Sequence, residues 1–238
     1  MLGVLGGMGP MATVDFMGKV IRNTPAACDQ DHIAMVVRSA TDVPDRTAAI
    51  LDQGRDPLPA MRHALHQLLE SGARCIAIPC NTAHHWHGAL QNETDVPILH
   101  IVDAVAETLA REGLEGATIG VLATDGTVHA GVYQARLAAR GYACMMPDAA
   151  AQAEVMRAIR LVKAGKLNEA TAILRREAET LVQHGCARVA MACTEIPLAL
   201  ADVGGALQVR LFDPTEALAR ACVSFCLARV DRDARAAA

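Results

Sequence analysis

Two cysteines stand at the ends of two similar apolar segments, CIAIPCNTAHHW at 75–86 and RVAMACTEIPLA at 188–199. Cys80 and Cys193 are 113 positions apart, and each leads into a segment with a helical pattern. A thiol near a helix N-terminus has a lowered pKa and can act as a base. Either cysteine alone would be interpreted as a buried structural thiol, but the symmetric placement of the two predicts a pair of acid/base groups.

Polar residues next to these cysteines could hold an anionic ligand. Asn81, Thr82 and Thr194 can donate hydrogen bonds to carboxylate oxygens or to the thiolates. In the loop ATDVPDRT at 40–47, Arg46 can bind a carboxylate with two parallel hydrogen bonds, although a solvated arginine is the commoner case. Lys163 is a second candidate cation, with an ordinary position near a helix end as its alternative.

The segment LGGMGPMATV at 5–14 passes from an apolar run through glycines into a helical pattern. Such a turn can hold an anion at a helix N-terminus, or it can simply need the backbone freedom of glycine. The spacing is not the GxGxxG dinucleotide fingerprint. The corresponding segment LATDGT at 122–127 places the hydroxyls of Thr124 and Thr127 in the other half of the chain, which favours an anion site.

The histidines of HHWH at 84–87 raise the alternative of a metal site. No further cluster of cysteine and histidine stands at zinc spacing, so we expect no metal. His84 is interpreted as a polar group close to the thiol, with a role as a proton relay, and His85 and His87 as surface residues.

The chain alternates short β-branched runs with longer helical patterns, which predicts parallel sheets covered by helices. The expected strands are 2–6, 33–38, 74–79, 96–101, 117–123, 142–146, 187–192 and 208–212. Segments 3–10 and 120–127 match at a shift of 117, and 96–103 matches 209–216 at the 113 that separates the cysteines. We therefore expect two similar α/β halves related by a pseudo-two-fold axis. Ligands bind beyond the carboxyl ends of parallel strands, so both cysteines should face one cleft between the halves.

Composition excludes several classes of partner. The 238 residues are 52% hydrophobic with a formal net charge of −4 and few aromatic residues, which argues against binding to nucleic acid or to anionic membranes. No segment has transmembrane length, and the N-terminus lacks the basic region of a signal peptide. The eight cysteines show no zinc spacing. We expect a cytoplasmic protein.

Taken together, these segments resemble the aspartate racemase family within the cofactor-independent aspartate/glutamate racemase superfamily. The segments that carry the resemblance are GVLGGMGPMAT, TPAACDQDHI, VPDRTAAIL, PCNTAHHW, VLATDGT, GVY, VMRAIRLVKAGKL, ACTEIPL and DPTEALA, in order over nearly the whole chain. The resemblance implies two α/β lobes, 1–101 with 212–238 and 102–211, with the active site in the cleft between them. It also implies a homodimer.

The same resemblance implies roles for individual residues. Cys80 and Cys193 would be the catalytic thiols, and Arg46 and Lys163 would bind the side-chain carboxylate of the substrate. Asn81, Thr82 and Thr194 would hold the α-carboxylate and amine. The substrate-binding set expected on this basis also contains Met8, Thr124, Thr127 and Glu195.

The implied activity is interconversion of L- and D-aspartate, or glutamate, by two-base proton transfer without pyridoxal phosphate or a metal. Three alternatives stay open: a broad-specificity amino-acid racemase, a lyase or isomerase that uses one thiol, and a catalytically silent amino-acid-binding relative. The loop PDRT at 44–47 is of the type that accompanies acidic substrates.

Overall fold

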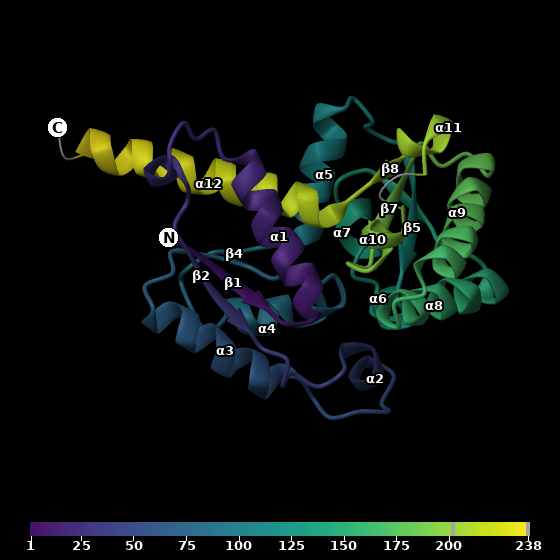
Figure 1. Ribbon diagram of the computed structural model, residues 1–238, viewed down its shortest axis with the longest axis horizontal. Helices are drawn as coiled ribbons and strands as arrows, with labels where there is room; N and C mark the ends of the chain where they lie inside the picture. The colour runs from purple at the N-terminus through teal and green to yellow at the C-terminus, as the bar shows by residue number, and fades with distance from the viewer. Residues whose placement is uncertain (201–202, 237–238) are drawn as a thin grey trace.

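The computed structural model describes residues 1–200 and 203–236, in which each half of the chain forms one parallel four-stranded sheet (Figure 1). The first sheet has the order β2-β1-β3-β4, with β1 (Leu2–Gly6), β2 (Met35–Ser39), β3 (Cys75–Ala77) and β4 (Ile98–Leu99). The second has the order β6-β5-β7-β8, with β5 (Thr118–Ala123), β6 (Ala143–Met145), β7 (Arg188–Ala192) and β8 (Leu211–Phe212). Every expected run overlaps one strand, and the two sheets have the same strand order. The prediction of two similar α/β halves is confirmed.

Helices connect the strands in both halves. The first half contains α1 (Pro10–Asn23), α2 (Arg46–Ile50), α3 (Leu58–Glu70), α4 (His87–Gln91), α5 (Ile101–Arg111) and the 3₁₀ helices η1 (Asp29–Asp31) and η2 (Thr82–Trp86). The second half contains α6 (Asp125–His129), α7 (Gln134–Ala138), α8 (Ala149–Lys163), α9 (Leu167–Gln183), α10 (Ile196–Leu200), α11 (Gly205–Gln208) and α12 (Pro214–Ala236).

The glycine-rich turn after β1 is explained by close packing. Gly7 has a φ of +89°, and a Cβ there would lie 2.3 Å from the backbone nitrogen of Ala40. The Gly7 amide donates to Oγ1 of Thr13 at 2.8 Å, and Gly9 caps α1 without a side-chain hydrogen bond. Because the Gly7 amide is already bonded within the protein, the structure favours the tight turn over the anion cradle.

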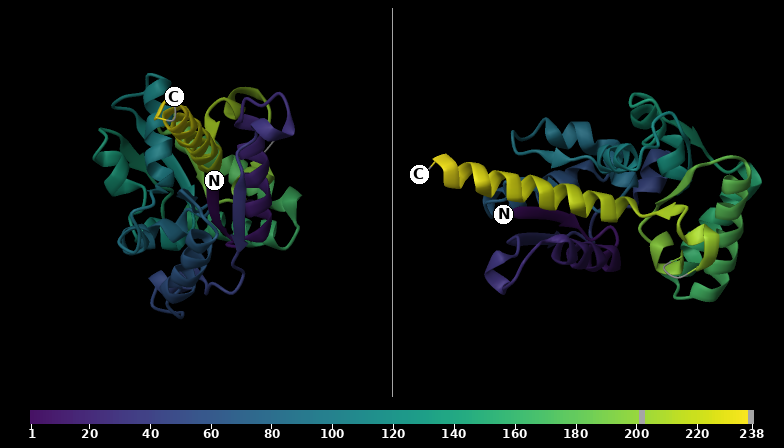
Figure 2. Two further views of the ribbon diagram at one scale, coloured as in Figure 1. Left: turned by 90° about the vertical axis from the view of Figure 1, so that its left-hand side faces the viewer. Right: turned by 90° about the horizontal axis from the view of Figure 1, so that it is seen from above.

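One hydrophobic core joins the two halves. It contains Leu2 and Val4 from β1, Ile119 and Val121 from β5, and Leu218 from α12, all fully buried. Helix α12 starts directly after β8 in the second sheet and runs back along α1 and α5, as the two views of Figure 2 show. This shared core opposes wholesale separation of the sheets, because separation would expose apolar side chains to water.

The division into lobes 1–101 with 212–238 and 102–211 stays a prediction, and residues 237–238 of it lie outside the described residues. Helix α12 contacts α1 and β3 of the first proposed lobe and α5, most of which belongs to the second. Buried Lys19 of α1 pairs with Asp15 and with Asp213, which precedes α12. Among the described residues, no helix is long and apolar enough to cross a membrane.

Candidate active site

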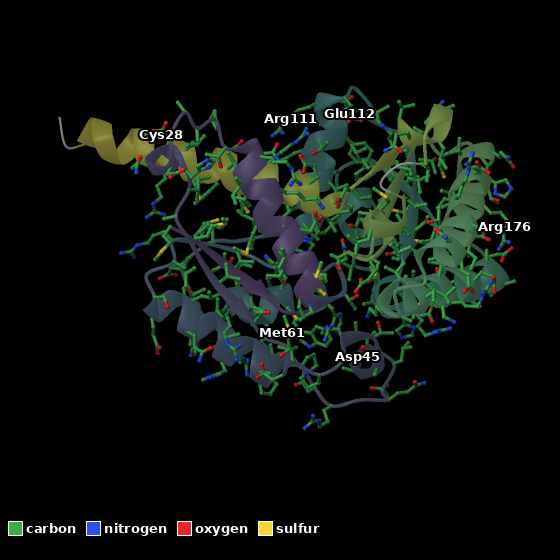
Figure 3. The ribbon with its side chains drawn as sticks, in the orientation of Figure 1. Cys28, Asp45, Met61, Arg111, Glu112 and Arg176 are labelled. Carbon is green, nitrogen blue, oxygen red and sulfur yellow. The ribbon has the colours of Figure 1, made fainter. Side chains whose placement is uncertain are left out.

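A small cavity of about 30 Å³ lies where the two halves meet, and both cysteines line it. The first half contributes Met8, Asp45, Arg46, Thr47, Cys80, Asn81 and Thr82; the second contributes Thr124, Lys163, Cys193, Thr194 and Glu195. Every site residue predicted from the sequence therefore lines the cavity except Thr127. Figure 3 labels Asp45, which lies at the start of α2.

The strands place the two thiols. Cys193 directly follows β7, and Cys80 follows β3 after two further buried residues. Both cysteines are 6% exposed. β3 and β7 are second to last in their sheets, each next to the strand that opens its half, so the repeat in the sequence becomes a symmetric pair of thiols facing one cavity.

The pKa values of the thiols differ from the sequence-based expectation. Burial raises the pKa of Cys80 and the Glu195 carboxylate adds to the rise, while the Arg46 guanidinium, which also hydrogen-bonds the thiol, and the Ala83 amide oppose it. Burial raises the pKa of Cys193 well above its ordinary value, and the Glu195 carboxylate adds to the rise. The expected lowering by a helix N-terminus was wrong, because only five-residue helices follow and desolvation of a thiolate outweighs their dipole. The charge with the largest effect is thus positive at Cys80, from Arg46, and negative at Cys193, from Glu195.

Two side chains at the cavity have free donors. Nη1 of Arg46 donates to the carbonyl oxygens of Val43 and Pro44 at 3.1 and 2.9 Å, while its Nε is buried without a partner. Nδ2 of Asn81 is also buried without a partner. Buried donors in proteins are nearly always bonded, so this pair marks where an anion would bind.

Asn81 is oriented by Tyr133, a fully buried residue between α6 and α7. The Tyr133 hydroxyl donates to Oδ1 of Asn81 at 2.6 Å, which directs Nδ2 to the unpaired position. In the sequence, Tyr133 stands out only as part of the segment GVY. No local pattern could assign its role, because the two residues are 52 positions apart.

Three threonine hydroxyls connect the halves behind the cavity. Oγ1 of Thr82 lies 3.0 Å from Oγ1 of Thr124 and 2.9 Å from Oγ1 of Thr127. Thr127 is 1% exposed and does not line the cavity, so it supports Thr82 and Thr124 from behind. These mutual contacts attach the turn that contains Cys80 to the second half of the chain.

Glu195 links the second thiol to Lys163. Its Oε2 accepts hydrogen bonds from Sγ of Cys193 at 3.0 Å and from Oγ1 of Thr194 at 3.1 Å. Its Oε1 lies 3.7 Å from Nζ of Lys163, whose side chain is 51% exposed. Lys163 therefore reaches the site from the solvent side and is paired with a carboxylate of the protein.

His84 is not a proton relay, contrary to the interpretation from sequence. Its Nδ1 lies 2.9 Å from the carbonyl oxygen of Cys80, and its Nε2 accepts from the Ile101 amide at 3.1 Å. These partners require a neutral ring with the proton on Nδ1, and burial lowers the pKa of His84 to about 3. Its two bonds brace the Cys80 turn against the start of α5.

The other histidines also have structural positions. His85 is exposed, as expected, but His87 is partly buried, with Nε2 at 2.7 Å from the carbonyl oxygen of Ile98. No group of three histidine, cysteine or carboxylate side chains within residues 1–200 and 203–229 is arranged to hold a metal ion.

Two further cavity residues, Asp45 and Thr47, were not predicted from the sequence. Asp45 caps α2 by accepting from the Ala48 amide at 2.7 Å, and Thr47 packs against Gly126 of α6. A Cβ at Gly126 would lie 2.8 Å from Cα of Thr47, so the segment that carries Arg46 rests directly on the second half. In the sequence, the only sign of a role for these two residues is that they stand on either side of Arg46 in the loop.

A family model described as Asp/Glu/Hydantoin racemase matches residues 5–222. The chain belongs to this racemase family. The broad-specificity amino-acid racemase RacX of Bacillus subtilis (strain 168) is 27% identical over 232 residues, which cover 96% of this chain and 99% of RacX. The aspartate racemase of Picrophilus torridus superposes with a TM-score of 0.81 at 29% identity, covering 94% of this chain and 93% of that one.

A glutamate racemase from Francisella tularensis subsp. tularensis SCHU S4, solved with D-glutamate, has a TM-score of 0.67 at 14% identity and covers 96% of this chain and 81% of that one. At this identity the likeness is one of fold. The resemblance to the aspartate/glutamate racemase superfamily seen in the sequence is confirmed, and the family's reaction class is racemisation, an isomerisation.

Proposed function

We propose that this chain racemises aspartate, with glutamate as the nearest further substrate, using Cys80 and Cys193 as the two bases and no cofactor. The observation that carries this proposal is the cavity itself, which has one buried thiol from each half and unpaired donors on Arg46 and Asn81. Racemisation needs proton removal on one face of the α-carbon and proton return on the other. With one thiol from each half, the first can remove the proton and the second can return one on the opposite face.

The proposed reaction starts with one thiolate and one thiol. The thiolate takes the α-proton, and the opposite thiol donates its proton to the other face, so the number of protons on the enzyme does not change. Negative charge that develops on the α-carbon and carboxylate is stabilised by Nδ2 of Asn81, which takes the place of water in a buried site. The hydroxyls of Thr82 and Thr194 line the same cavity and would turn from their present partners to donate to the substrate.

Arg46 is the proposed partner of the side-chain carboxylate. Its Nη1 bonds hold the guanidinium in place, which leaves Nε for the ligand. Lys163 would assist from the solvent side. A cavity of about 30 Å³ holds no more than a few water molecules, so it must widen for an amino acid. The shared core makes the α2 segment, rather than a whole half, the part we expect to move.

Broad specificity is the second candidate function, and one observation favours it. A cavity of about 220 Å³ adjoins the site and is lined in part by Met11, Ala12, Val162 and Leu198, which could accept an apolar side chain. The relative RacX, which aligns with nearly the whole chain, bears a broad-specificity name. The remaining alternatives would use the same cavity: a lyase or an isomerase would need only one of the two thiols, and a silent binding protein would need neither.

A chiral assay of the purified protein distinguishes these functions. L-aspartate, L-glutamate and a panel of neutral L-amino acids are each incubated with protein dialysed against chelator, and both enantiomers are quantified. Aspartate racemisation well above that of the neutral amino acids supports the proposal. Equal turnover of neutral amino acids supports broad specificity, and products other than the enantiomer support the one-sided chemistry.

Assembly and location are further proposals. We propose a homodimer, supported by the apolar side chains Met11, Val14 and Ile21 of α1, which are 67%, 61% and 46% exposed. Light scattering tests it, and a monomer at micromolar concentration would contradict it. A small-molecule substrate, rather than nucleic acid or a membrane, fits the acidic charge, and a cytoplasmic location fits the eight free cysteines.

A further inference from the structure

Glu195 is expected from the sequence to bind substrate, but the structure gives its carboxylate other partners. One oxygen accepts the Cys193 thiol and the Thr194 hydroxyl at 3.0 and 3.1 Å, and the other faces Nζ of Lys163 at 3.7 Å. Only 14% of the Glu195 side chain is exposed. A carboxylate held this way is in direct contact with the proton that Cys193 would donate.

Glu195 also lies at the boundary between two cavities. The inner cavity of about 30 Å³ contains both thiols, and the outer cavity of about 220 Å³ lies between the start of α1 and helices α8 and α10. Lys163, Thr194 and Glu195 are the residues that line both. The outer cavity has room for several water molecules, so Glu195 connects the buried thiol to a place where protons can exchange with water.

The two thiols differ in the charge beside them. Cys80 has the positive charge of Arg46, which favours its thiolate and opposes the effect of burial, and the charge of Glu195, which disfavours the thiolate by less than Arg46 favours it. Cys193 has the negative charge of Glu195, to which its thiol donates a hydrogen bond; this charge favours the thiol, acts in the same direction as burial and outweighs the opposing charge of Lys163. When one proton is shared by the pair, this arrangement places it on Cys193.

We propose that Glu195 is the proton carrier of Cys193, which keeps this residue a thiol in the resting enzyme and returns a proton to it from the outer cavity after turnover. The inference rests on the proposed function. In the forward direction the Cys80 thiolate takes the α-proton and Cys193 gives up its own. Glu195 then transfers one proton from water to the Cys193 thiolate, and Cys80 releases one proton to water as product leaves, so the resting form is restored without net change.

The arrangement makes the enzyme asymmetric although its fold is repeated. The resting form, with thiolate on Cys80 and thiol on Cys193, is ready for the enantiomer whose α-hydrogen faces Cys80. The other enantiomer needs the opposite form, which the Glu195 charge disfavours. Glu195→Gln removes this charge and the ability to carry a proton while it keeps the size of the side chain.

The first test measures the protonation of the pair and needs no activity. The full-length protein is treated briefly with iodoacetamide, which reacts with thiolates, and labelling at Cys80 and Cys193 is quantified by mass spectrometry. In the wild type we expect Cys80 to be labelled first. In Glu195→Gln the rate at Cys193 relative to Cys80 should rise about tenfold, which corresponds to a change of one unit in the difference between the two pKa values; both thiols lose the Glu195 charge, but only Cys193 also loses its hydrogen bond to the carboxylate. Glu195→Asp, which keeps the charge, should retain the wild-type order.

Glu179→Gln is the matched control, because Glu179 lies on the exposed side of α9 in an ion pair with Arg175. It should label like the wild type. A wild-type ratio in Glu195→Gln, with native circular dichroism, overturns the inference whatever the activity. If Glu195→Gln does not fold, the Glu195→Asp variant decides: labelling of Cys193 before Cys80 in that variant would also overturn the inference.

The second test uses the rate of racemisation against pH. We expect Glu195→Gln to lower kcat more than it raises KM and to move the alkaline limb of the pH profile to lower pH by about one unit, because the Cys193 thiol ionises more easily. A raised KM with an unchanged kcat and an unmoved limb would instead make Glu195 a ligand of the substrate ammonium group. Absence of any racemisation by the wild type would refute the proposed function, while the labelling order would still decide the role of Glu195.

Discussion

Replacing Tyr133 with phenylalanine tests whether a residue far from the cysteines in sequence orients the substrate-binding amide. The Tyr133 ring is fully buried, and its hydroxyl donates to Oδ1 of Asn81 at 2.6 Å, while Asn81 is only 2% exposed. Burial raises the pKa of Tyr133 well above its ordinary value, so the hydroxyl remains a donor at every assay pH. In Tyr133→Phe the buried Oδ1 loses its partner and the amide loses its fixed orientation.

The expected effect on stability is about 1–3 kcal/mol, the cost of one buried polar group without a hydrogen bond. For a chain of this size, that corresponds to a fall in Tm of roughly 2–4 °C per kcal/mol. We expect kcat/KM to fall about tenfold, because loss of one oriented donor removes about 1.4 kcal/mol of transition-state stabilisation. Melting followed by circular dichroism and the chiral assay measure the two effects separately.

The other tyrosine of the chain provides the control. Tyr142 is 4% exposed and lies just before β6, outside the cavity residues. Tyr142→Phe should leave kcat/KM within about twofold of the wild type, because Tyr142 does not line the cavity. If Tyr133→Phe kept the wild-type kcat/KM, the proposed orientation of Asn81 by Tyr133 would be refuted.

Two further predictions concern charge. Arg46→Ala should weaken binding of acidic substrates by about 1.5–3 kcal/mol, the scale of a charged hydrogen bond, and affect neutral amino acids much less; equal losses in KM for aspartate and alanine would assign Arg46 to structure. His84, with a folded pKa of about 3, is held neutral, so its contribution to stability is complete above the unfolded value near 6.5 and is lost as the pH falls from there toward 3. Urea unfolding between pH 7 and pH 5 should show a decrease in the free energy of unfolding, to which His87 and His100 also contribute because burial lowers their pKa values. The His84 share is roughly 1.4 kcal/mol per pH unit below 6.5, so the decrease should be smaller by about that amount in His84→Gln, and an identical decrease in both proteins would contradict this account.

The strands were predictable from the sequence because parallel strands buried on both faces are continuous apolar runs. β1 is buried at all five positions, and its run at 2–6 has the same bounds as the strand. The repeat at a shift of 113 then placed both thiols at equivalent strand ends, which is why Cys80 and Cys193 could be paired from their spacing alone. Such inferences need only local patterns and their separation along the chain.

The features that the sequence did not reveal depend on contacts between distant segments. Thr127 was expected to bind substrate, but it lies behind Thr82, which is 45 positions away. His84 was expected to be a relay, but the backbone groups of Cys80 and Ile101 hold both of its nitrogens. The direction of the cysteine pKa shifts was also missed, because burial depends on packing from both halves and cannot be read from one helix start.

The most direct test of the two-thiol mechanism is deuterium incorporation in heavy water by the wild type, Cys80→Ala and Cys193→Ala, with native folding checked by circular dichroism. In the wild type, solvent deuterium should appear first in the product enantiomer, since its proton comes from the opposite thiol. Each variant should lose racemisation by about two to four decades, the contribution of one proton-transfer group, and each should retain slow exchange only in the enantiomer whose hydrogen faces its remaining thiol. Equal initial deuteration of substrate and product by the wild type, or near-normal turnover by either folded variant, would contradict the claim that Cys80 and Cys193 act from opposite faces.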